Sequence, residues 1–302
     1  MLPALALIAT LAAGRAAYPR LVELRQRVRR KVGSDGLIAG AAPVTRLRDH
    51  APGVLLLHGG GDTPQVLSAL ADHLHAAGFS VRVPLLGGHG RDLRALDRVA
   101  AAEWHAQVAQ ELDAMRRSHS WLGVVGLSMG GALAVRAASQ RTDIAALVLL
   151  APYVAMPDLV RRLADTSPWW GWLVPYFSSF GSRSIRDQVA AERALGHGIL
   201  TPAMLRALRD VVDTAWEALP GVSAPTLVIQ SREDNRIAAE CAESGFARLG
   251  ARNKKFVWTN GAGHVITVDF GFQRVFELTR DWLEVHRSAA TRRNERARPG
   301  SR

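Results

Sequence analysis

Apolar runs of strand length alternate with longer segments of helical periodicity along most of the chain. The short runs are almost continuously apolar, which is typical of strands buried on both faces of a parallel sheet. The longer segments repeat apolar positions every three or four residues, as amphipathic helices do. This alternation predicts a doubly wound, mostly parallel α/β sheet. The predicted strands are 53–58, 79–84, 121–126, 144–150, 225–230 and, nearer an edge, 255–259, and the predicted helices are 64–77, 101–117, 130–140, 238–249 and 271–285.

One long segment interrupts the alternation, because no convincing strand is found between Ala151 and Gly221. It contains six prolines and a cluster of aromatic residues. We predict a mostly helical cap at about residues 152–220, inserted after the strand at 144–150. The aromatic rings would line an acyl pocket, face lipid, or only pack the cap onto the sheet, and the sequence leaves these alternatives open. The cluster comprises Trp169, Trp170, Trp172, Tyr176, Phe177 and Phe180.

Basic residues are concentrated at the two ends of the chain. Of the net charge of +11, residues 1–33 carry +6 and residues 287–302 carry +5, so residues 34–286, the predicted α/β domain, are neutral. A nucleic-acid-binding protein would place basic residues on its folded face, so we expect no nucleic-acid partner. The distribution fits attraction to an anionic membrane surface, or solubility alone. The charged segment 287–302 has few apolar residues, and we predict that it is disordered.

The N-terminal segment is apolar first and basic afterwards. Residues 2–14 are apolar but fewer than the ~20 that a membrane span needs, and positive charge follows the run, whereas in a signal peptide it precedes. Leu21, Leu24 and Val28 then recur at helical spacing among arginines, which suits a basic amphipathic helix on a bilayer surface. Two interpretations stay open: an N-terminal membrane anchor with a cytoplasmic catalytic domain, or a helix docked on the protein.

A G-x-S-x-G motif lies at residues 126–130, between an apolar strand and a predicted helix. This strand–turn–helix context is what a nucleophile elbow requires. The glycines permit a tight, strained turn, since a Cβ at either flanking position would collide with the backbone. We therefore predict Ser128 as the nucleophile. A serine hydroxyl needs a base to remove its proton, and its partners should follow in the chain order Ser, Asp or Glu, His, each at the end of a strand.

Two downstream residues meet these requirements. His264 follows the last predicted strand in a glycine-rich loop and is the candidate general base. Asp234 follows the strand before it and is the candidate acid, which would fix the histidine tautomer and stabilise the imidazolium. The adjacent Glu233 is a rival for that role. Asp269 comes after the histidine and breaks the chain order, so we discount it.

A glycine-rich loop ends the first clear strand with the residues HGGGD at 58–62. A loop of this kind supplies one backbone N–H of an oxyanion hole, and the residue after the nucleophile supplies the other. We predict that Gly60, or alternatively Gly61, supplies the N–H of the loop, and that Met129 supplies the N–H after the nucleophile. His58 is expected to be a structural loop residue. No Lys-Ser/Thr pair follows the glycines, so a phosphate-binding P-loop is not expected.

No pattern of metal or cofactor ligands is present in the sequence. The single cysteine, Cys241, excludes an intramolecular disulfide. Neither a CxxC pair nor an HExxH motif occurs, so we expect catalysis without a metal or cofactor.

Five pieces of the chain are similar to the small bacterial carboxylesterases and monoacylglycerol lipases of the α/β-hydrolase superfamily, over about residues 50–285. The resemblance implies a triad of Ser128, Asp234 and His264, and an oxyanion hole made by the backbone of Gly60 and Met129. Such esterases often have a bulky residue where Gly60 stands, and this departure bears on the shape of the acyl pocket. The similar pieces are LLLHGGGDTP at 55–64, VPLLGGHG at 83–90, VVGLSMGGALA at 124–134, APTLVIQSREDNRI at 224–237 and GAGHVITVD at 261–269.

Together these observations predict a serine hydrolase that cleaves carboxylic esters through an acyl-enzyme. An apolar cap beside an apolar, basic N-terminus favours a lipid-like ester such as a monoacylglycerol. A thioesterase or amidase would use the same triad and stays an alternative. A catalytically inactive hydrolase fold used for binding is the second alternative.

Overall fold

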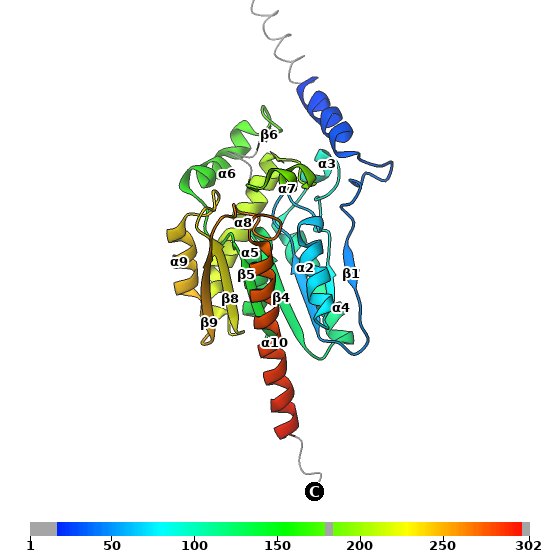
Figure 1. Cartoon of the computed structure of the whole chain (residues 1–302). Coiled ribbons are helices and arrows are strands. Elements are labelled where there is room, and N and C mark those ends of the chain that lie inside the picture. Colours follow the sequence, from blue (N-terminus) through cyan, green and yellow to red (C-terminus); the bar gives the residue numbers. More distant parts are fainter. Residues whose placement is uncertain (1–16, 179–183, 298–302) are drawn as a thin grey trace, which may run out of the picture.

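The computed structural model describes residues 17–178 and 184–297, and within them a seven-stranded sheet forms the centre of the molecule (Figure 1). The strand order is β1-β3-β2-β4-β5-β8-β9. Strand β1 (Val44–Arg46) pairs antiparallel with β3, and the remaining neighbours in the order are parallel. The parallel strands are β2 (Gly53–Leu57), β3 (Ser80–Val83), β4 (Leu122–Leu127), β5 (Ile144–Leu150), β8 (Thr226–Ser231) and β9 (Lys254–Thr259).

Helices cover both faces of the sheet, so the molecule has three layers (Figure 1). Successive side chains of a strand point to opposite faces. In β2, Leu55 and Leu57 therefore pack into the core cluster with α4, α5 and α8 (Pro202–Ala218), whereas Val54 and Leu56 pack into the cluster with α2 and α10. Burial on both sides explains why the strands read as continuous apolar runs. The helices outside the cap are α2 (Gln65–Ala76), α3 (Leu93–Leu96), α4 (Ala101–Ser118), α5 (Met129–Gln140), α9 (Ala239–Arg248) and α10 (Phe272–Ala297).

The predicted doubly wound, mostly parallel α/β sheet is confirmed. Each predicted strand is present within about one residue of its expected bounds, and β9 lies at an edge of the sheet. The three-residue strand β1 was not expected, because it is too short to show a period-2 pattern.

The segment after β5 is mostly helical, with one correction. It contains helices α6 (Asp158–Trp170), α7 (Gln188–Arg193) and α8 (Pro202–Ala218), followed by the 3-10 turn η1 (Leu219–Gly221). The expectation of no strand here was wrong, since β6 (Phe177–Ser178) and β7 (Ile199–Leu200) form a small antiparallel pair. Strands of two residues are too short to show a periodic pattern in the sequence.

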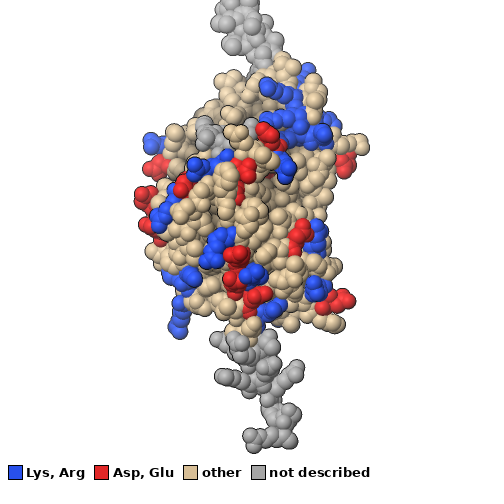
Figure 2. All heavy atoms as spheres, viewed as in Figure 1, with Lys and Arg blue, Asp and Glu red and all other residues tan. Residues whose placement is uncertain are grey.

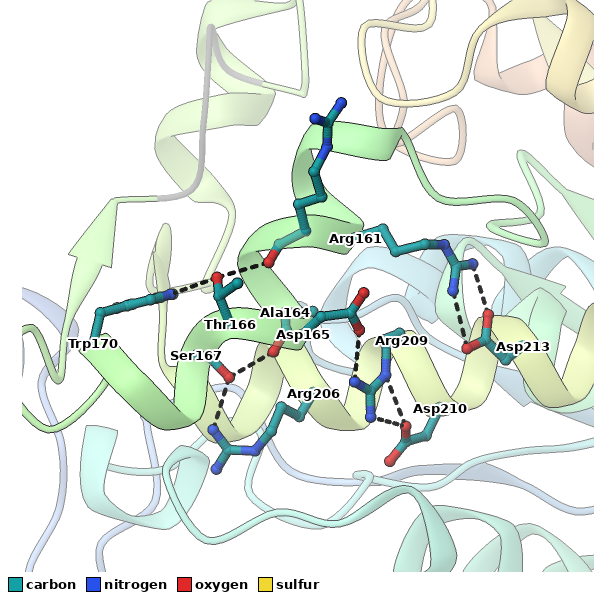
Figure 3. A network of polar contacts seen from close by, with 11 residues as sticks. Arg161, Ala164, Asp165, Thr166, Ser167, Trp170, Arg206, Arg209, Asp210 and Asp213 are labelled. Carbon is teal, nitrogen blue, oxygen red and sulfur yellow. Dashed lines mark hydrogen bonds and ion pairs between the residues drawn. The ribbon is translucent and has the colours of Figure 1, made fainter.

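Ion pairs fasten helix α6 to helix α8 (Figure 3). Arg161 forms two hydrogen bonds to the carboxylate of Asp213, at 2.6 and 3.0 Å. Arg209 of α8 binds Asp165 of α6 at 2.8 Å. Pairs of this exposure contribute little singly, but together they fix the register of the two helices.

Residues 17–30 form an N-terminal helix, dark blue in Figure 1, which lies beside the cap. The hydroxyl of Tyr18 donates to the carbonyl of Tyr176 at 2.7 Å, and the hydroxyl of Tyr176 donates to Glu23 at 2.8 Å. Residues 17–30 are thus docked on the protein, whereas the apolar run at 2–14 lies outside the described residues. In the part of the chain that the structure describes, no helix is long and apolar enough to span a bilayer.

The C-terminal segment differs from the expectation of disorder from residue 287 onward. Helix α10 continues to Ala297, and in Figure 1 it projects beyond the sheet. Arginine, alanine and glutamate are strong helix formers, so they prolong a helix that has already been nucleated on the sheet. Residues 298–302 lie outside the described part.

Candidate active site

Ser128 occupies a strained turn between strand β4 and helix α5. Its φ angle is 54°, in the left-handed region that L-residues rarely adopt. A Cβ at Gly126 would lie 2.3 Å from the carbonyl oxygen of Gly130, and a Cβ at Gly130 would lie 2.2 Å from that of Leu57. Both glycines are therefore required for the turn, as the motif predicted. The turn places the serine side chain at the carboxyl edge of the sheet.

The structure brings Ser128, His264 and Asp234 together although the serine and the histidine are 136 residues apart. The Oγ of Ser128 lies 2.7 Å from Nε2 of His264. The other ring nitrogen, Nδ1, lies 2.8 Å from Oδ2 of Asp234. In the tautomer that satisfies both contacts, Nδ1–H donates to the carboxylate and Nε2 accepts from the hydroxyl. The side chains predicted as nucleophile, base and orienting acid thus form one hydrogen-bonded chain.

Asp234 is buried and is held ionised by its hydrogen bonds. Burial raises the pKa of Asp234, but the hydrogen bond and charge of His264 and the backbone N–H groups of Arg236 and Ile237 outweigh it, so the net pKa lies below the usual value. The two N–H groups bind Oδ1 at 2.7 and 3.0 Å. The amide of Gln230 also donates to Oδ2 at 2.7 Å. A carboxylate fixed in this way can stabilise an imidazolium beside it.

The rival acid, Glu233, points elsewhere. Its Oε2 accepts from the backbone N–H of Gly261 at 2.9 Å and from the hydroxyl of Ser231 at 3.2 Å. The structure shows no hydrogen bond or ion pair between Glu233 and His264, both of which lie in the described part. Glu233 therefore holds the loop that carries the histidine and does not touch the ring.

The two predicted oxyanion donors, Gly60 and Met129, line the same cavity as Ser128. Met129 is the first residue of α5, so its N–H has no intrahelical acceptor. Among the described residues, neither the N–H of Met129 nor that of Gly60 donates a hydrogen bond. Gly61, the alternative to Gly60, has a φ angle of 79°. Two unpaired N–H groups near the nucleophile are what a tetrahedral oxyanion needs.

A cavity of about 820 Å³ opens at Ser128 and His264. One side of it is apolar and is lined from the cap by Val160, Leu205 and Leu208. Within the aromatic cluster, Tyr176 and Phe177 line the cavity, whereas Trp169 is 83% exposed and Trp172 is also exposed. The rings of the cluster therefore do not share one environment, since Tyr176 and Phe177 line the cavity while Trp169 and Trp172 are exposed. Phe180 lies outside the described residues.

Comparison with known proteins places the chain in a family. The sequence model of the family described as "Serine aminopeptidase, S33" matches residues 48–270, which is most of the chain. The chain belongs to this family of α/β-hydrolases. The suspected resemblance to that superfamily is thereby confirmed, and the chain is a hydrolase.

Relatives of this S33 hydrolase include lipases and esterases. The thermostable monoacylglycerol lipase of Bacillus sp. (strain H-257) is 27% identical over 251 residues, which cover 83% of this chain and 97% of the relative. A carboxylesterase of Bacillus subtilis (strain 168) is 22% identical over 233 residues, covering 76% and 92%. A solved structure from work on the metagenome-derived lipolytic enzymes LipS and LipT is 26% identical, with a TM-score of 0.77, covering 83% of this chain and 100% of that chain. The Paleococcus ferrophilus monoacylglycerol lipase shares the fold, with 22% identity, a TM-score of 0.70 and coverage of 81% and 98%.

The departure at Gly60 has a structural counterpart in this S33 hydrolase. A Cβ at Gly60 would lie 3.0 Å from Cε of Met204 and 3.4 Å from Sδ of Met129. Met204 is fully buried and comes from helix α8 of the cap. Flexible methionine side chains thus fill the space in which a larger residue at position 60 would sit.

His58 has the structural role expected of it. It is fully buried, with Nδ1 at 2.9 Å from the carbonyl of Gly59 and Nε2 accepting from the N–H of Leu86 at 3.1 Å. Burial, aided by the neighbouring His89, lowers the pKa of His58 to about 3. A neutral ring that bridges two loops fixes the oxyanion loop and takes no part in proton transfer.

Asp269 was discounted as the triad acid, yet it organises the loop that carries His264. Its buried carboxylate accepts the N–H of Gly263, the residue before His264, at 2.7 Å. It also accepts the N–H groups of Arg186 and Asp187 at 2.7 and 2.9 Å. One side chain therefore ties the histidine loop to the part of the cap directly before helix α7. Asp269 is the last residue of the segment GAGHVITVD, but the spacing of residues in the sequence did not predict its role.

We expect Asp269→Asn to destabilise the protein by about 2–4 kcal/mol, because an amide would place an N–H donor against backbone donors in a buried site. The kcat should fall as well, since the histidine loop loses its anchor. Equilibrium denaturation and steady-state kinetics measure the two effects. Asp281, an exposed carboxylate that forms an ion pair with Arg280, provides the matched control. Asp281→Asn should change the free energy of unfolding by less than about 0.5 kcal/mol. Equal stability of the two variants would contradict the role of Asp269.

Asp62 is a second carboxylate in the S33 site that sequence reasoning did not single out. It lines the catalytic cavity, and a Cβ at Gly59 would lie 2.6 Å from its Oδ2 and 3.2 Å from Cβ of Ser128. Burial raises the pKa of Asp62 to about 6, against the opposing charges of His264 and Arg236. Its raised pKa means that the folded state holds the Asp62 proton more tightly than the unfolded chain does.

We expect Asp62→Asn to stabilise the protein at neutral pH. Between its usual pKa near 4 and about 6, the folded state binds more protons at Asp62 than the unfolded state, so stability falls as pH rises through this window. The variant should not lose stability in this window. Its free energy of unfolding should exceed that of the wild type by about 1–2 kcal/mol above pH 6, and should not exceed it below about pH 4. Denaturation across this pH range checks it, with the exposed Asp49→Asn as control. A pH-independent difference would contradict the assignment.

Proposed function

We propose that this chain is a serine hydrolase that cleaves carboxylic esters through an acyl-enzyme on Ser128. The observation that carries the proposal is the chain of contacts from Ser128 through His264 to Asp234, at 2.7 and 2.8 Å, beside a large cavity. The relatives named monoacylglycerol lipase and carboxylesterase support an ester as the substrate. The triad residues and the oxyanion donors Gly60 and Met129 are assigned within this proposal.

In the proposed mechanism, Oγ of Ser128 attacks the ester carbonyl carbon while Nε2 of His264 removes the hydroxyl proton. The carbonyl oxygen becomes an oxyanion and accepts hydrogen bonds from the N–H groups of Gly60 and Met129; losing one such donor costs about 2.7–4 kcal/mol in a comparable enzyme. The imidazolium then gives its proton to the departing alcohol, which leaves an acyl-serine. Water repeats the sequence and releases the carboxylic acid.

The apolar side of the cavity favours an ester with a lipid-like acyl chain, such as a monoacylglycerol. Val160, Leu205 and Leu208 can bury such a chain, and each buried methylene contributes about 0.8 kcal/mol. A panel of esters that differ only in acyl length tests this specificity. We expect kcat/KM to rise with chain length up to the size of the cavity. A steep preference for acyl groups of two to four carbons would contradict it.

Amide or thioester cleavage is the alternative with the same triad, and the description of the family as aminopeptidase gives it a reason. An aminopeptidase needs acidic groups to bind a free amine. The described residues that line the cavity include the single carboxylate Asp62 and four arginines, Arg25, Arg29, Arg30 and Arg236, which disfavours a cationic substrate. Turnover of an oxoester, a thioester and an amide of one acyl group separates the alternatives.

We also propose that the basic N-terminal segment contacts an anionic membrane surface. Leu21, Leu24 and Val28 are exposed on one face of the N-terminal helix among basic side chains, an arrangement suited to a bilayer surface. Flotation with vesicles tests it. The wild type should bind vesicles that contain an anionic lipid more tightly than neutral ones, and replacing the three residues with serine should weaken binding. Equal recovery with both kinds of vesicle would contradict the proposal.

A further inference from the structure

The N-terminal helix forms a wall of the catalytic cavity. It lies outside residues 48–270, the part of the chain that the family model matches. The positions that line the cavity follow helical spacing, and the exposed apolar residues lie on another face. The lining residues are Tyr18, Val22, Arg25, Gln26, Arg29 and Arg30.

Polar contacts fix this wall in place. The carboxylate of Glu23 accepts from Tyr176 at 2.8 Å and pairs with Arg94 at 2.8 Å. At the other end of the helix, the guanidinium of Arg30 donates to the carbonyls of Ala194 and Gly196. Contacts along its length make the helix a preformed part of the site.

Two arginines of this wall carry charges without an acidic partner. Arg25 and Arg29 stand one helical turn apart, and both line the cavity. Neither forms an ion pair among the described residues, and Glu23, the single acid in residues 17–30, is already paired. Figure 2 shows basic side chains gathered where Figure 1 has this helix. A surface of this charge favours a negatively charged ligand.

Gln26 lies between the two arginines in the sequence and adds a second observation. It is 6% exposed and lines the cavity, and its amide oxygen has no hydrogen-bond partner among the described residues. A buried polar group without a partner costs about 1–3 kcal/mol. A hydroxyl of a bound ligand would supply the missing donor.

We propose that the alcohol half of the ester substrate carries a negatively charged group, such as a phosphate, bound by Arg25 and Arg29, and a hydroxyl that donates to Gln26. The substrate class is then the acyl ester of a polyol phosphate. Guanidinium groups bind phosphate oxygens through charge-assisted hydrogen bonds. This inference rests on the proposed ester hydrolysis and names the part of the substrate that the acyl pocket does not hold.

The test compares two soluble substrates with the same short acyl chain, 1-hexanoylglycerol and its 3-phosphate, below the concentration at which either aggregates. We expect the wild type to prefer the phosphate in kcat/KM. In the double variant Arg25→Glu/Arg29→Glu, that preference should fall about tenfold or more, because two attractive contacts become repulsive. The matched control is Arg20→Glu/Arg27→Glu, which makes the same charge change on exposed residues that do not line the cavity. It should retain most of the preference.

Further arms separate the alternatives. The double variant should still hydrolyse the neutral ester. If the wild type hydrolyses neither ester, the proposed function is rejected. If the wild type hydrolyses both esters at equal kcat/KM, this inference alone is rejected. A preference that arises only when anionic vesicles are present would assign the arginines to a lipid surface and overturn a substrate subsite. Gln26→Ala should raise KM for the phosphate ester more than it lowers kcat, and an unchanged KM would exclude the amide from the site.

Discussion

Replacing Ser128 with alanine is expected to lower kcat for ester hydrolysis by about 10⁴–10⁶-fold. The hydroxyl oxygen is the atom that would become acylated, and it forms a hydrogen bond with Nε2 of His264. Alanine adopts the strained turn at the same cost as serine, so the melting temperature should stay within a few degrees of the wild type. Steady-state kinetics and thermal unfolding measure the two quantities.

A serine on the following helix serves as the control for this change. Ser139 of α5 donates its hydroxyl to the carbonyl of Arg136 and lies far along the helix from the site. Ser139→Ala should leave kcat within about twofold, since it is separate from the chemistry. If Ser128→Ala retained a tenth of wild-type kcat, another nucleophile would have to carry the reaction.

The second large effect is expected at the acid. Asp234→Asn should lower kcat by about 10⁴-fold while the fold is preserved. An amide oxygen can still accept the backbone N–H groups of Arg236 and Ile237, but the amide nitrogen cannot accept from Nδ1 of His264. The histidine would then turn to the tautomer that presents a proton to Ser128 and could not serve as its base.

Glu233→Gln is the matched control, because the two acids are adjacent and undergo the same change of charge. Its carboxylate binds the N–H of Gly261 and the hydroxyl of Ser231, so we expect a loss in kcat of less than about tenfold. A larger loss at Glu233 than at Asp234 would reverse the assignment of the acid.

Much of the fold could be predicted because the central strands are buried on both faces. Leu55 and Leu57 face one core cluster and Val54 and Leu56 the other, so the whole of β2 must be apolar. Strand β1 lacks that constraint, since it is short and lies at the edge. Helix α10 extends to Ala297 because its last residues have high helix propensity and continue from turns that are already formed. The prediction of disorder considered only the low apolar content of this segment and therefore missed the extension.

The candidate triad could be predicted because local rules place each member. A glycine-flanked turn positions Ser128, and the ends of two later strands position Asp234 and His264. Asp62 and Asp269 could not be assigned in this way, because their surroundings are set by distant segments: the side chains of His264 and Arg236 act on Asp62, and backbone N–H groups bind Asp269. The N-terminal wall of the cavity was hidden for the same reason: its contacts join residues 17–30 to residues 176–196.

The most direct measurement of the central claim is reaction of the purified wild-type protein with a fluorophosphonate, followed by intact mass and peptide mapping. A serine hydroxyl is reactive toward this reagent only when a base activates it. We predict a single adduct on Ser128, formed at a rate that falls sharply in Asp234→Asn and by less than about tenfold in Glu233→Gln. A folded wild-type protein that forms no adduct on Ser128 would contradict the account and favour a binding role for the hydrolase fold.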